Sequence, residues 1–357
     1  MKAFLFAAAA MIALTCGAKE LKILMIGNSF SQSVLTYLPK IVAAAPDCKL
    51  KLGQAMIGGC TFEYHCKVFR RAEQDPTYRP YWTNLKLNPK QPKNHQANLK
   101  ELLTADQWNI VTIQQGSHQS WKAETFGADA DELIGIVRKY APQAEIVVHQ
   151  TWAYRSDDPR IAPKNPTWKI SQKEMYNRLT ANYTQLAKRY HFRIIPVGFA
   201  IELSREKTPV KFRQYDPAIL ETLHFPDLPN QAGDVVGNIH WRKSAKTGDM
   251  EIRRDTFHLN CRGKYLQACT WFLFLFDKKA EDVKFIPNDI GDKDARFLLQ
   301  CAEEAVARFP QVKKIIQFSS RRVILSDSLF PLHPLFPALP LLHLVGEKTS
   351  LRKIPFF

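Results

Sequence analysis

The sequence predicts an α/β fold, a flavodoxin-like three-layer sandwich built around a mostly parallel five-stranded sheet. Apolar, β-rich runs alternate along the chain with segments of helical periodicity, which is typical of successive β-α-β units. The chain has 357 residues, of which 45% are hydrophobic and 24% charged, so it can bury a sizeable core as one large domain or two ordinary ones. This composition excludes a disordered protein.

Five apolar runs predict the strands of this sheet, at 22–26, 49–57, 109–115, 145–150 and 193–199. Apolar residues at helical spacing predict the intervening helices, over 33–45, 129–141 and about 172–190. A last helix is predicted over 264–276 by the segment "KYLQACTWFLFLF". In open parallel sheets, ligands bind outside the carboxyl ends of the strands, so functional residues are expected there.

Residues 1–18, "MKAFLFAAAAMIALTCGA", have the pattern of a secretory signal peptide: one lysine, an apolar run, and small residues before a cleavage site. The run is too short for a membrane-spanning helix, and no transmembrane span is expected elsewhere. An alternative is lipid anchoring through Cys16, although Ala13 and Thr15 fit a lipoprotein signal poorly. We therefore expect a secreted or periplasmic chain that begins near Lys19.

The main domain is predicted over 19–318, with insertions near 66–96, 155–171 and 202–254. Long excursions from an α/β core often shape a binding cleft. Residues 319–357 are rich in Leu, Pro and Phe and follow neither structural period. Because proline prevents a continuous helix, we expect a poorly ordered tail and assign it no function.

The formal net charge of +16 is carried by basic residues that are dispersed along the chain. No zinc finger, RNA-binding sheet motif or basic zipper accompanies them, so nucleic acid is not expected as a partner. Anionic glycans or an acidic envelope fit an exported basic protein better, and a solvated basic surface without a specific partner fits as well. The oligomeric state is not indicated by the sequence.

Six cysteines remain after removal of the leader: Cys48, Cys60, Cys66, Cys261, Cys269 and Cys301. In an oxidising compartment they allow up to three disulfides in fifteen possible pairings, and Cys60 and Cys66 could close a small loop. A Cys-x-x-Cys metal spacing is absent, so no metal is expected.

Ser29 comes directly after the first predicted strand, where its hydroxyl would face the ligand crevice. A second interpretation is that Asn28, Ser29 or Ser31 only caps the following helix. Near the end of the α/β region, Asp255 and His258 lie three residues apart in a turn before the last helix. A serine nucleophile needs a base and an acid that orients the base, and these residues could supply them.

Four short blocks occur in order: "IGNSFS" at 26–31, "GG" at 58–59, "QQGS" at 114–117 and "DTFHLN" at 255–260. They resemble the blocks of the SGNH hydrolases, also called the GDSL esterase superfamily. The sequence is most similar to the exported bacterial branch that begins with Gly-Asn-Ser-Phe-Ser and has no settled activity. The resemblance spans about 21–275 and implies the SGNH hydrolase fold, with Ser29 as nucleophile, His258 as general base and Asp255 as its orienting carboxylate.

The resemblance also implies an oxyanion hole made by the backbone N–H groups of Ser29 and Gly59 and by a side-chain amide of the third block. The usual asparagine of that block is absent, and Gln114 and Gln115 stand there instead. We favour Gln115, because it precedes Gly116 at the loop entry. Gln114 is expected to face the opposite side of the strand.

Five residues are candidates for substrate binding: Asn28, Gln114, His149, Trp152 and His65. Asn28 replaces the aspartate of many superfamily members. Trp152 lies just past the fourth strand, where it could stack on a sugar or pack in the core. His65, with Glu63, could line the cleft or bind a metal, but no third ligand is evident. His240 and Trp241 of "GNIHW" are expected in a lid.

The sequence therefore predicts an exported serine esterase, most closely a carbohydrate O-acetylesterase that acts on a small-molecule or polysaccharide ester. This mechanism requires no cofactor. The carbohydrate specificity rests on export, aromatic residues near the strand ends and family analogy. Two alternatives stay open: a non-catalytic glycan-binding protein, suggested by the altered first and third blocks, and a lipase or thioesterase, for which no apolar acyl tunnel is evident.

Overall fold

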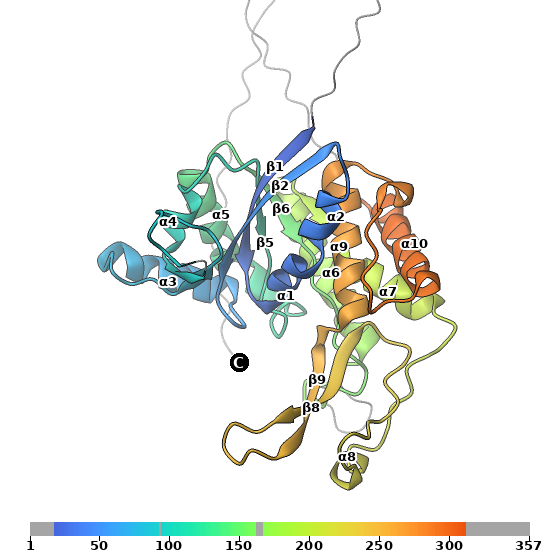
Figure 1. The fold of residues 1–357 in the computed structure, drawn as a ribbon. Coiled ribbons are helices and arrows are strands. Elements are labelled where there is room, and N and C mark those ends of the chain that lie inside the picture. The colour runs from blue at the N-terminus through green and yellow to red at the C-terminus, as the bar shows by residue number, and fades with distance from the viewer. Residues whose placement is uncertain (1–17, 93, 162–166, 312–357) are drawn as a thin grey trace, which may run out of the picture. The chain divides into compact units, whose positions relative to one another are not determined.

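The structure is a computed structural model that describes residues 18–92, 94–161 and 167–311. The predicted leader, apart from Ala18, and the predicted tail at 319–357 lie outside the described residues. A twisted central sheet carries helices on both faces (Figure 1). The predicted α/β fold class is thus confirmed.

The sheet has seven strands in the order β4-β3-β2-β1-β5-β6-β7. Their bounds are β1 Lys19–Gly27, β2 Cys48–Met56, β3 Tyr81–Thr83, β4 His95–Ala97, β5 Ile110–Ile113, β6 Glu145–His149 and β7 Arg193–Ile195. The five predicted strands pair in parallel, whereas β3 and β4 are antiparallel and extend one edge. The predicted strand number was therefore two too low, because the insertion near 66–96 supplies both edge strands.

Ten α-helices lie in the described residues: α1 Ser29–Gln32, α2 Leu38–Ala43, α3 Phe62–Gln74, α4 Leu99–Leu103, α5 Ala128–Tyr140, α6 Gln172–Tyr190, α7 Val197–Lys207, α8 Ile219–Thr222, α9 Cys261–Phe276 and α10 Asp292–Arg308. Helices α3, α4 and α5 pack together in one layer, while α2, α7 and α10 all pack against α9 in the other. The helix predicted over 33–45 is interrupted: a 3-10 turn ends at Thr36, and α2 starts afresh with Pro39 in its first turn.

The predicted strand over 193–199 is shorter than expected. It ends at Ile195, because Pro196 has no N–H to donate to the sheet, and α7 begins at Val197. The strand β1 is buried along its second half, from Ile23 to Gly27, which is typical of a parallel strand covered on both faces. This central position places the end of β1, and the serine that follows it, at the middle of the sheet edge.

A two-stranded antiparallel hairpin, β8 Val236–Lys243 and β9 Met250–Leu259, projects from the α/β body below α9 (Figure 1). Asp255 and His258 lie on β9, so the prediction of a turn at this point was wrong. β9 runs directly into α9, and Asn260 caps that helix by accepting a hydrogen bond from the Gly263 N–H. The hairpin therefore carries the predicted base and acid to the carboxyl edge of the sheet.

The helix α9 is the most apolar helix of the chain, and from Gly263 to Phe276 every residue except Lys264 is buried. It has 16 residues, fewer than the roughly 20 needed to span a bilayer. Within the described ranges, no helix combines the length and the apolar character of a membrane span.

All six cysteines of the described residues are free thiols. The Cys60 thiol donates to its neighbour's carbonyl, that of Thr61, and the Cys66 thiol donates to the carbonyl of Asp129. The small loop that the sequence allowed between these two cysteines is therefore not closed. Five of the six side chains are buried and only Cys261 is partly exposed.

Candidate active site

The chain turns sharply where β1 ends, and Asn28 holds this turn. Its side-chain oxygen accepts the Phe30 N–H at 3.0 Å and its amide donates to the Cys60 carbonyl at 3.0 Å. Asn28 is therefore the cap of α1, and it leaves the Ser29 hydroxyl free for another partner. Asn28 is buried, so its predicted contact with substrate is replaced by this supporting role.

The structure brings Ser29, His258 and Asp255 into one hydrogen-bonded chain. The Ser29 Oγ lies 2.8 Å from Nε2 of His258, although the two residues are 229 positions apart. On the other side of the ring, His258 Nδ1 lies 2.6 Å from Oδ2 of Asp255. The second oxygen of Asp255 accepts the backbone N–H groups of Phe257 at 3.0 Å and of His258 at 2.9 Å.

The protonation of Asp255 sets the tautomer of His258. Burial opposes ionisation of Asp255, but hydrogen bonds from the His258 ring and from two backbone N–H groups outweigh it and lower the pKa of Asp255 to about 2. An ionised carboxylate can only accept, so His258 Nδ1 is the donor. In the neutral ring, Nε2 is then the acceptor and faces the hydroxyl of Ser29.

Aromatic side chains hold the His258 ring in place. Phe30 meets it edge-on, with ring centroids 5.7 Å apart, and Phe257 lies beside it at 4.3 Å. Trp152 stacks on Phe30 at 4.0 Å, and its indole N–H donates to the Phe257 carbonyl at 2.9 Å. The ring is thus supported from both the α1 side and the β9 side.

A buried ionic cluster fixes the strand β9 to the segment after β6. The guanidinium of Arg155 is buried and binds Asp157 in a bidentate pair at 2.6 and 2.9 Å. Asp157 also accepts from Arg254 at 3.0 Å, and the backbone N–H of Arg155 donates to the Thr256 carbonyl at 2.8 Å. Removing one partner would leave a buried charge uncompensated, which typically costs about 3–5 kcal/mol.

Sequence reasoning missed this cluster, because 155–171 was interpreted only as a loop that shapes the cleft. Two signals were present: the charged run from Arg155 to Arg160 and the adjacent pair Arg253–Arg254. Neither is specific, since exposed loops also carry such charges. The structural role of this charged run becomes apparent only from the pairing of Asp157 with Arg254, about a hundred residues further along the chain.

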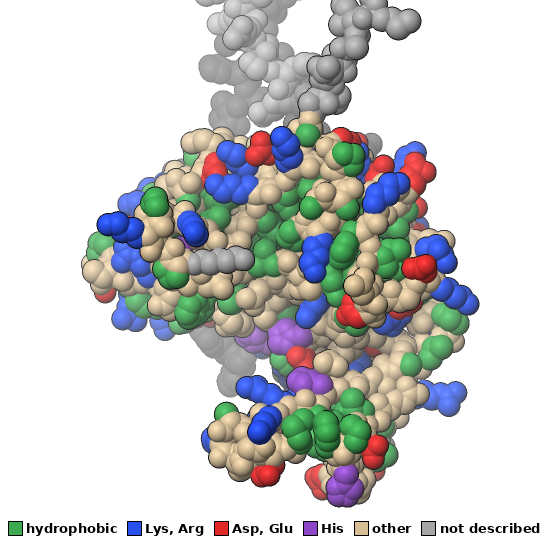
Figure 2. All heavy atoms as spheres, in the orientation of Figure 1, with side chains coloured by type: hydrophobic (Ala, Val, Ile, Leu, Met, Phe, Trp, Pro, Cys, Tyr) green, Lys and Arg blue, Asp and Glu red, His purple; other side chains and the backbone are tan. Residues whose placement is uncertain are grey.

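The triad opens into a cleft of about 410 Å³. Ser29 and His258 line it together with Gln32, Ser33 and Thr36. Asn238 and His240 of the hairpin and Lys264 of α9 line it as well. Figure 2 shows histidine side chains at the hollow between the α/β body and the hairpin. His240 thus contributes to the cleft wall.

Within the described ranges, the two backbone N–H groups predicted for an oxyanion hole, those of Ser29 and Gly59, have no partner within the protein. Gly59 is exposed and has a positive φ of 63°, a conformation that favours glycine. Gly116 packs closely against the turn that contains Gly59. A Cβ atom at position 116 would lie 3.0 Å from the Cys60 carbonyl oxygen. The second and third sequence blocks are therefore in contact.

The hydrogen bonds of Gln115, the predicted oxyanion donor, are directed at other loops. Its side-chain oxygen accepts the N–H groups of Phe62 and Gly116 at 2.8 Å, and its amide donates to the Thr125 carbonyl at 2.8 Å. The buried side chain therefore organises the loop behind the cleft. Gln114 is also buried, and it donates to Asn28 at 2.7 Å instead of facing substrate.

Both predicted substrate-binding histidines lie in the core. His65 is fully buried, and its Nδ1 lies 2.9 Å from the hydroxyl of Tyr81. His149 packs against Trp271 with ring centroids 5.2 Å apart. Burial lowers the pKa of each histidine to about 3, so both are neutral. Trp152 differs from them, because it lines the cleft as well as packing on its neighbours.

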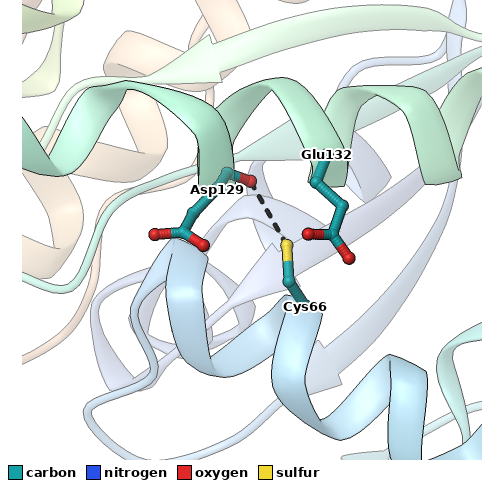
Figure 3. Close-up of side chains that lie close together, drawn as sticks. All are labelled: Cys66, Asp129 and Glu132. Atoms are coloured by element: carbon teal, nitrogen blue, oxygen red, sulfur yellow. Dashed lines mark hydrogen bonds between the residues drawn. The ribbon is translucent and has the colours of Figure 1, made fainter.

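Figure 3 shows a cluster of possible metal ligands, with Cys66 on α3 and Asp129 and Glu132 on α5. Burial raises the pKa of the Cys66 thiol to about 12, and the thiol donates to the Asp129 carbonyl at 3.2 Å. Glu132 is paired with Arg70 at 2.6 Å. The Cys66 thiol and the Glu132 carboxylate are therefore already held by contacts within the protein.

A family model described as "Domain of unknown function (DUF4886)" matches residues 22–212, from the first strand to just beyond α7. The chain belongs to the DUF4886 family. Among solved structures, a DUF4886 protein from Bacteroides uniformis has 24% identity and a TM-score of 0.62, covering 83% of this chain and 98% of that one. The two DUF4886 proteins therefore share a fold.

Two further matched structures are more distant. A candidate SGNH hydrolase from Slackia heliotrinireducens has 18% identity and a TM-score of 0.38, covering 71% of this chain and 97% of that one. A candidate GDSL-like lipase from Parabacteroides merdae has 13% identity and a TM-score of 0.39, covering 72% and 95%. No functionally curated protein matches the chain.

Proposed function

We propose that this DUF4886 protein is a serine esterase whose nucleophile is Ser29. One observation carries the proposal: a hydrogen-bonded chain from Asp255 through His258 to Ser29, with distances of 2.6 and 2.8 Å, opens into a cleft. A hydroxyl that only capped a helix would need neither the imidazole nor the carboxylate behind it.

In the proposed reaction, the Ser29 Oγ attacks the acyl carbon while His258 Nε2 takes the hydroxyl proton. Asp255, ionised because of its low pKa, stabilises the resulting imidazolium. The N–H groups of Ser29 and Gly59 would receive the developing oxyanion, and such a donor is typically worth about 3 kcal/mol. His258 then protonates the leaving alcohol, and water releases the acyl group by the same steps.

The substrate we propose is an O-acetylated carbohydrate. A cleft of about 410 Å³ with hydroxyl and amide groups on its walls suits a short acyl group and a polar alcohol. A long acyl chain would require a larger apolar channel. The cleft therefore favours the acetylesterase over the lipase or thioesterase alternative.

A row of aromatic rings leads away from His258 and supports the carbohydrate part. Phe257 contacts His258 at 4.3 Å, and Tyr154 contacts both Phe257 at 5.4 Å and Trp168 at 5.5 Å. Trp121 extends the row at 5.4 Å from Trp168. Phe257, Trp168 and Trp121 are partly exposed, so their rings could pack against the apolar faces of successive sugar units.

Turnover of 4-nitrophenyl acetate by purified wild-type protein and by Ser29→Ala tests the esterase proposal. We expect the variant to lose at least about 99.9% of kcat/KM, since the hydroxyl that His258 Nε2 contacts is removed. Ser31→Ala is the matched control, because Ser31 is buried and its hydroxyl donates to the Asn28 carbonyl. Equal rates for wild type and Ser29→Ala would leave only the glycan-binding alternative.

Export is part of the proposal and is supported by the leader-like residues 1–18 alone. Fractionation of the native host, followed by sequencing of the mature N-terminus, tests it. We expect a chain that begins near Lys19 outside the cytoplasm. A cytoplasmic protein that retains residue 1 would contradict export and leave the esterase proposal untouched.

A further inference from the structure

Lys264 is a cation on α9 that has no partner in the described part of the chain, whereas the other cation of this helix, Arg262, binds Asp294 at 2.6 Å. Lys264 is the one residue between Gly263 and Phe276 that is not buried, and it lines the cleft that contains Ser29. Among the residues that the structure describes, no carboxylate or carbonyl oxygen holds its ammonium group. The unpaired ammonium group is therefore available to a ligand that binds in the cleft.

Some lysines of the described residues are paired with carboxylates. Lys22 binds Asp106 at 2.9 Å and Lys173 binds Glu202 at 2.7 Å. Comparable partners hold further lysines, in the pairs Lys207–Glu304 and Lys278–Asp47. Within the described ranges, Lys264 has no such partner and lines the cleft, so its charge is available to a ligand there.

The cleft does not neutralise the charge of Lys264. The only carboxylate that lines it is Asp255, whose oxygens are already occupied by the His258 ring and by two backbone N–H groups. His240 contributes no negative charge, and its Nδ1 lies 3.2 Å from the amide of Asn238. A positive charge in a partly enclosed cleft attracts anions more strongly than the same charge on an open surface.

We propose that Lys264 binds a carboxylate of the substrate, so that the cleft takes acyl esters of acidic sugars in preference to neutral ones. This inference deepens the proposed esterase function and rests on it. A single ammonium group matches one carboxylate, whereas a phosphate is usually held by several donors or by the fork of an arginine. The aromatic row and the polar walls favour a sugar as the carrier of that carboxylate.

Hydrolysis of two matched acetyl esters tests the inference: O-acetylated oligogalacturonides, which are acidic, and O-acetylated xylo-oligosaccharides, which are neutral. For Lys264→Gln we expect kcat/KM to fall about tenfold on the acidic ester and to stay within about twofold on the neutral one. Lys188→Gln removes an exposed charge on α6 and should change neither. Equal effects on both esters, or no effect on either, would overturn the inference.

A binding measurement separates this inference from the esterase proposal. Calorimetric titration measures the Kd of deacetylated oligogalacturonide for Ser29→Ala and for the double variant Ser29→Ala/Lys264→Gln. We expect the Kd of the double variant to be about tenfold higher. Charge-dependent binding without any ester turnover would sink the esterase proposal and leave the acidic ligand standing. An unchanged Kd, or the absence of binding in both variants, would sink the acidic ligand even if Ser29 hydrolyses neutral esters.

Discussion

Asp255→Asn is the substitution whose consequences the geometry defines most sharply. One oxygen of Asp255 accepts two backbone N–H groups at 3.0 and 2.9 Å, and the other faces His258 Nδ1 at 2.6 Å. An asparagine keeps only one oxygen and must choose between these positions. Placing its NH₂ against the two backbone donors would lose both hydrogen bonds, at about 1 kcal/mol or more each.

The asparagine should therefore turn its NH₂ toward His258 and force the other tautomer of the ring. Nδ1 must then accept, Nε2 carries the proton, and the Ser29 hydroxyl has no base. The His258 tautomer that can accept the Ser29 proton is disfavoured by about 2–3 kcal/mol. Loss of the carboxylate also removes about 2–3 kcal/mol of stabilisation from the imidazolium. Together these losses predict a fall in kcat/KM of about 10³- to 10⁴-fold.

The assay is 4-nitrophenyl acetate hydrolysis by wild type, Asp255→Asn and Asp255→Ala, with thermal melting as a control for folding. Both variants should fold, because Asp255 is partly exposed at the cleft. If Asp255→Asn keeps more than about a tenth of the wild-type kcat/KM, the argument from the tautomer of His258 is refuted.

The low pKa of Asp255 also has a consequence for stability. Its pKa falls from 3.8 to about 2 on folding, so the carboxylate contributes stability above pH 3.8 that is lost as the pH falls through about 2. This shift corresponds to about 2 kcal/mol. The stability difference between wild type and Asp255→Asn, measured by urea unfolding, should shrink by that amount between pH 5 and pH 2. A constant difference would contradict the account.

Three further predictions follow from the support of the site. Gly237→Ala should lower Tm by several degrees, because φ is 88° and the new Cβ would lie 2.6 Å from Nη1 of buried Arg155; an unchanged Tm would contradict the packing. Gln115→Met should lower the free energy of unfolding in urea by about 2–4 kcal/mol, while the folded variant keeps its kcat. A loss of kcat without a loss of stability would instead indicate that Gln115 is an oxyanion donor. Thiol titration of the chain that begins near Lys19 should find six free cysteines after unfolding and only Cys261 reactive in the native state; fewer thiols after unfolding would reveal disulfides.

In the α/β core, the features that depend on local pattern were predictable. The second half of β1 is a continuous apolar run, since both faces are covered, and Ser29 could be placed at the sheet edge because it follows this central strand. The spacing of Asp255 and His258 also carried structural information. The carboxylate bonds the His258 N–H three residues on, which folds the acid back beside the base.

Several features that depend on pairing between distant segments could not be predicted from local sequence pattern. β3 and β4 have only three residues each, too few to show a period, and they exist because β2 offers an edge. The role of Gln115 was missed for the same reason, since its partners Phe62 and Thr125 come from other loops. An even number of cysteines suggested disulfides, but the Cys60 and Cys66 thiols are directed at different carbonyl oxygens.

The central claim is that His258 activates Ser29 as a nucleophile, and covalent trapping tests it most directly. Protein treated with diethyl 4-nitrophenyl phosphate would be digested and mapped by peptide mass spectrometry. The account predicts one diethylphosphoryl adduct, on Ser29, that is lost in His258→Ala even though that variant stays folded. An adduct on another residue, or equal labelling of Ser29 without the imidazole, would contradict it.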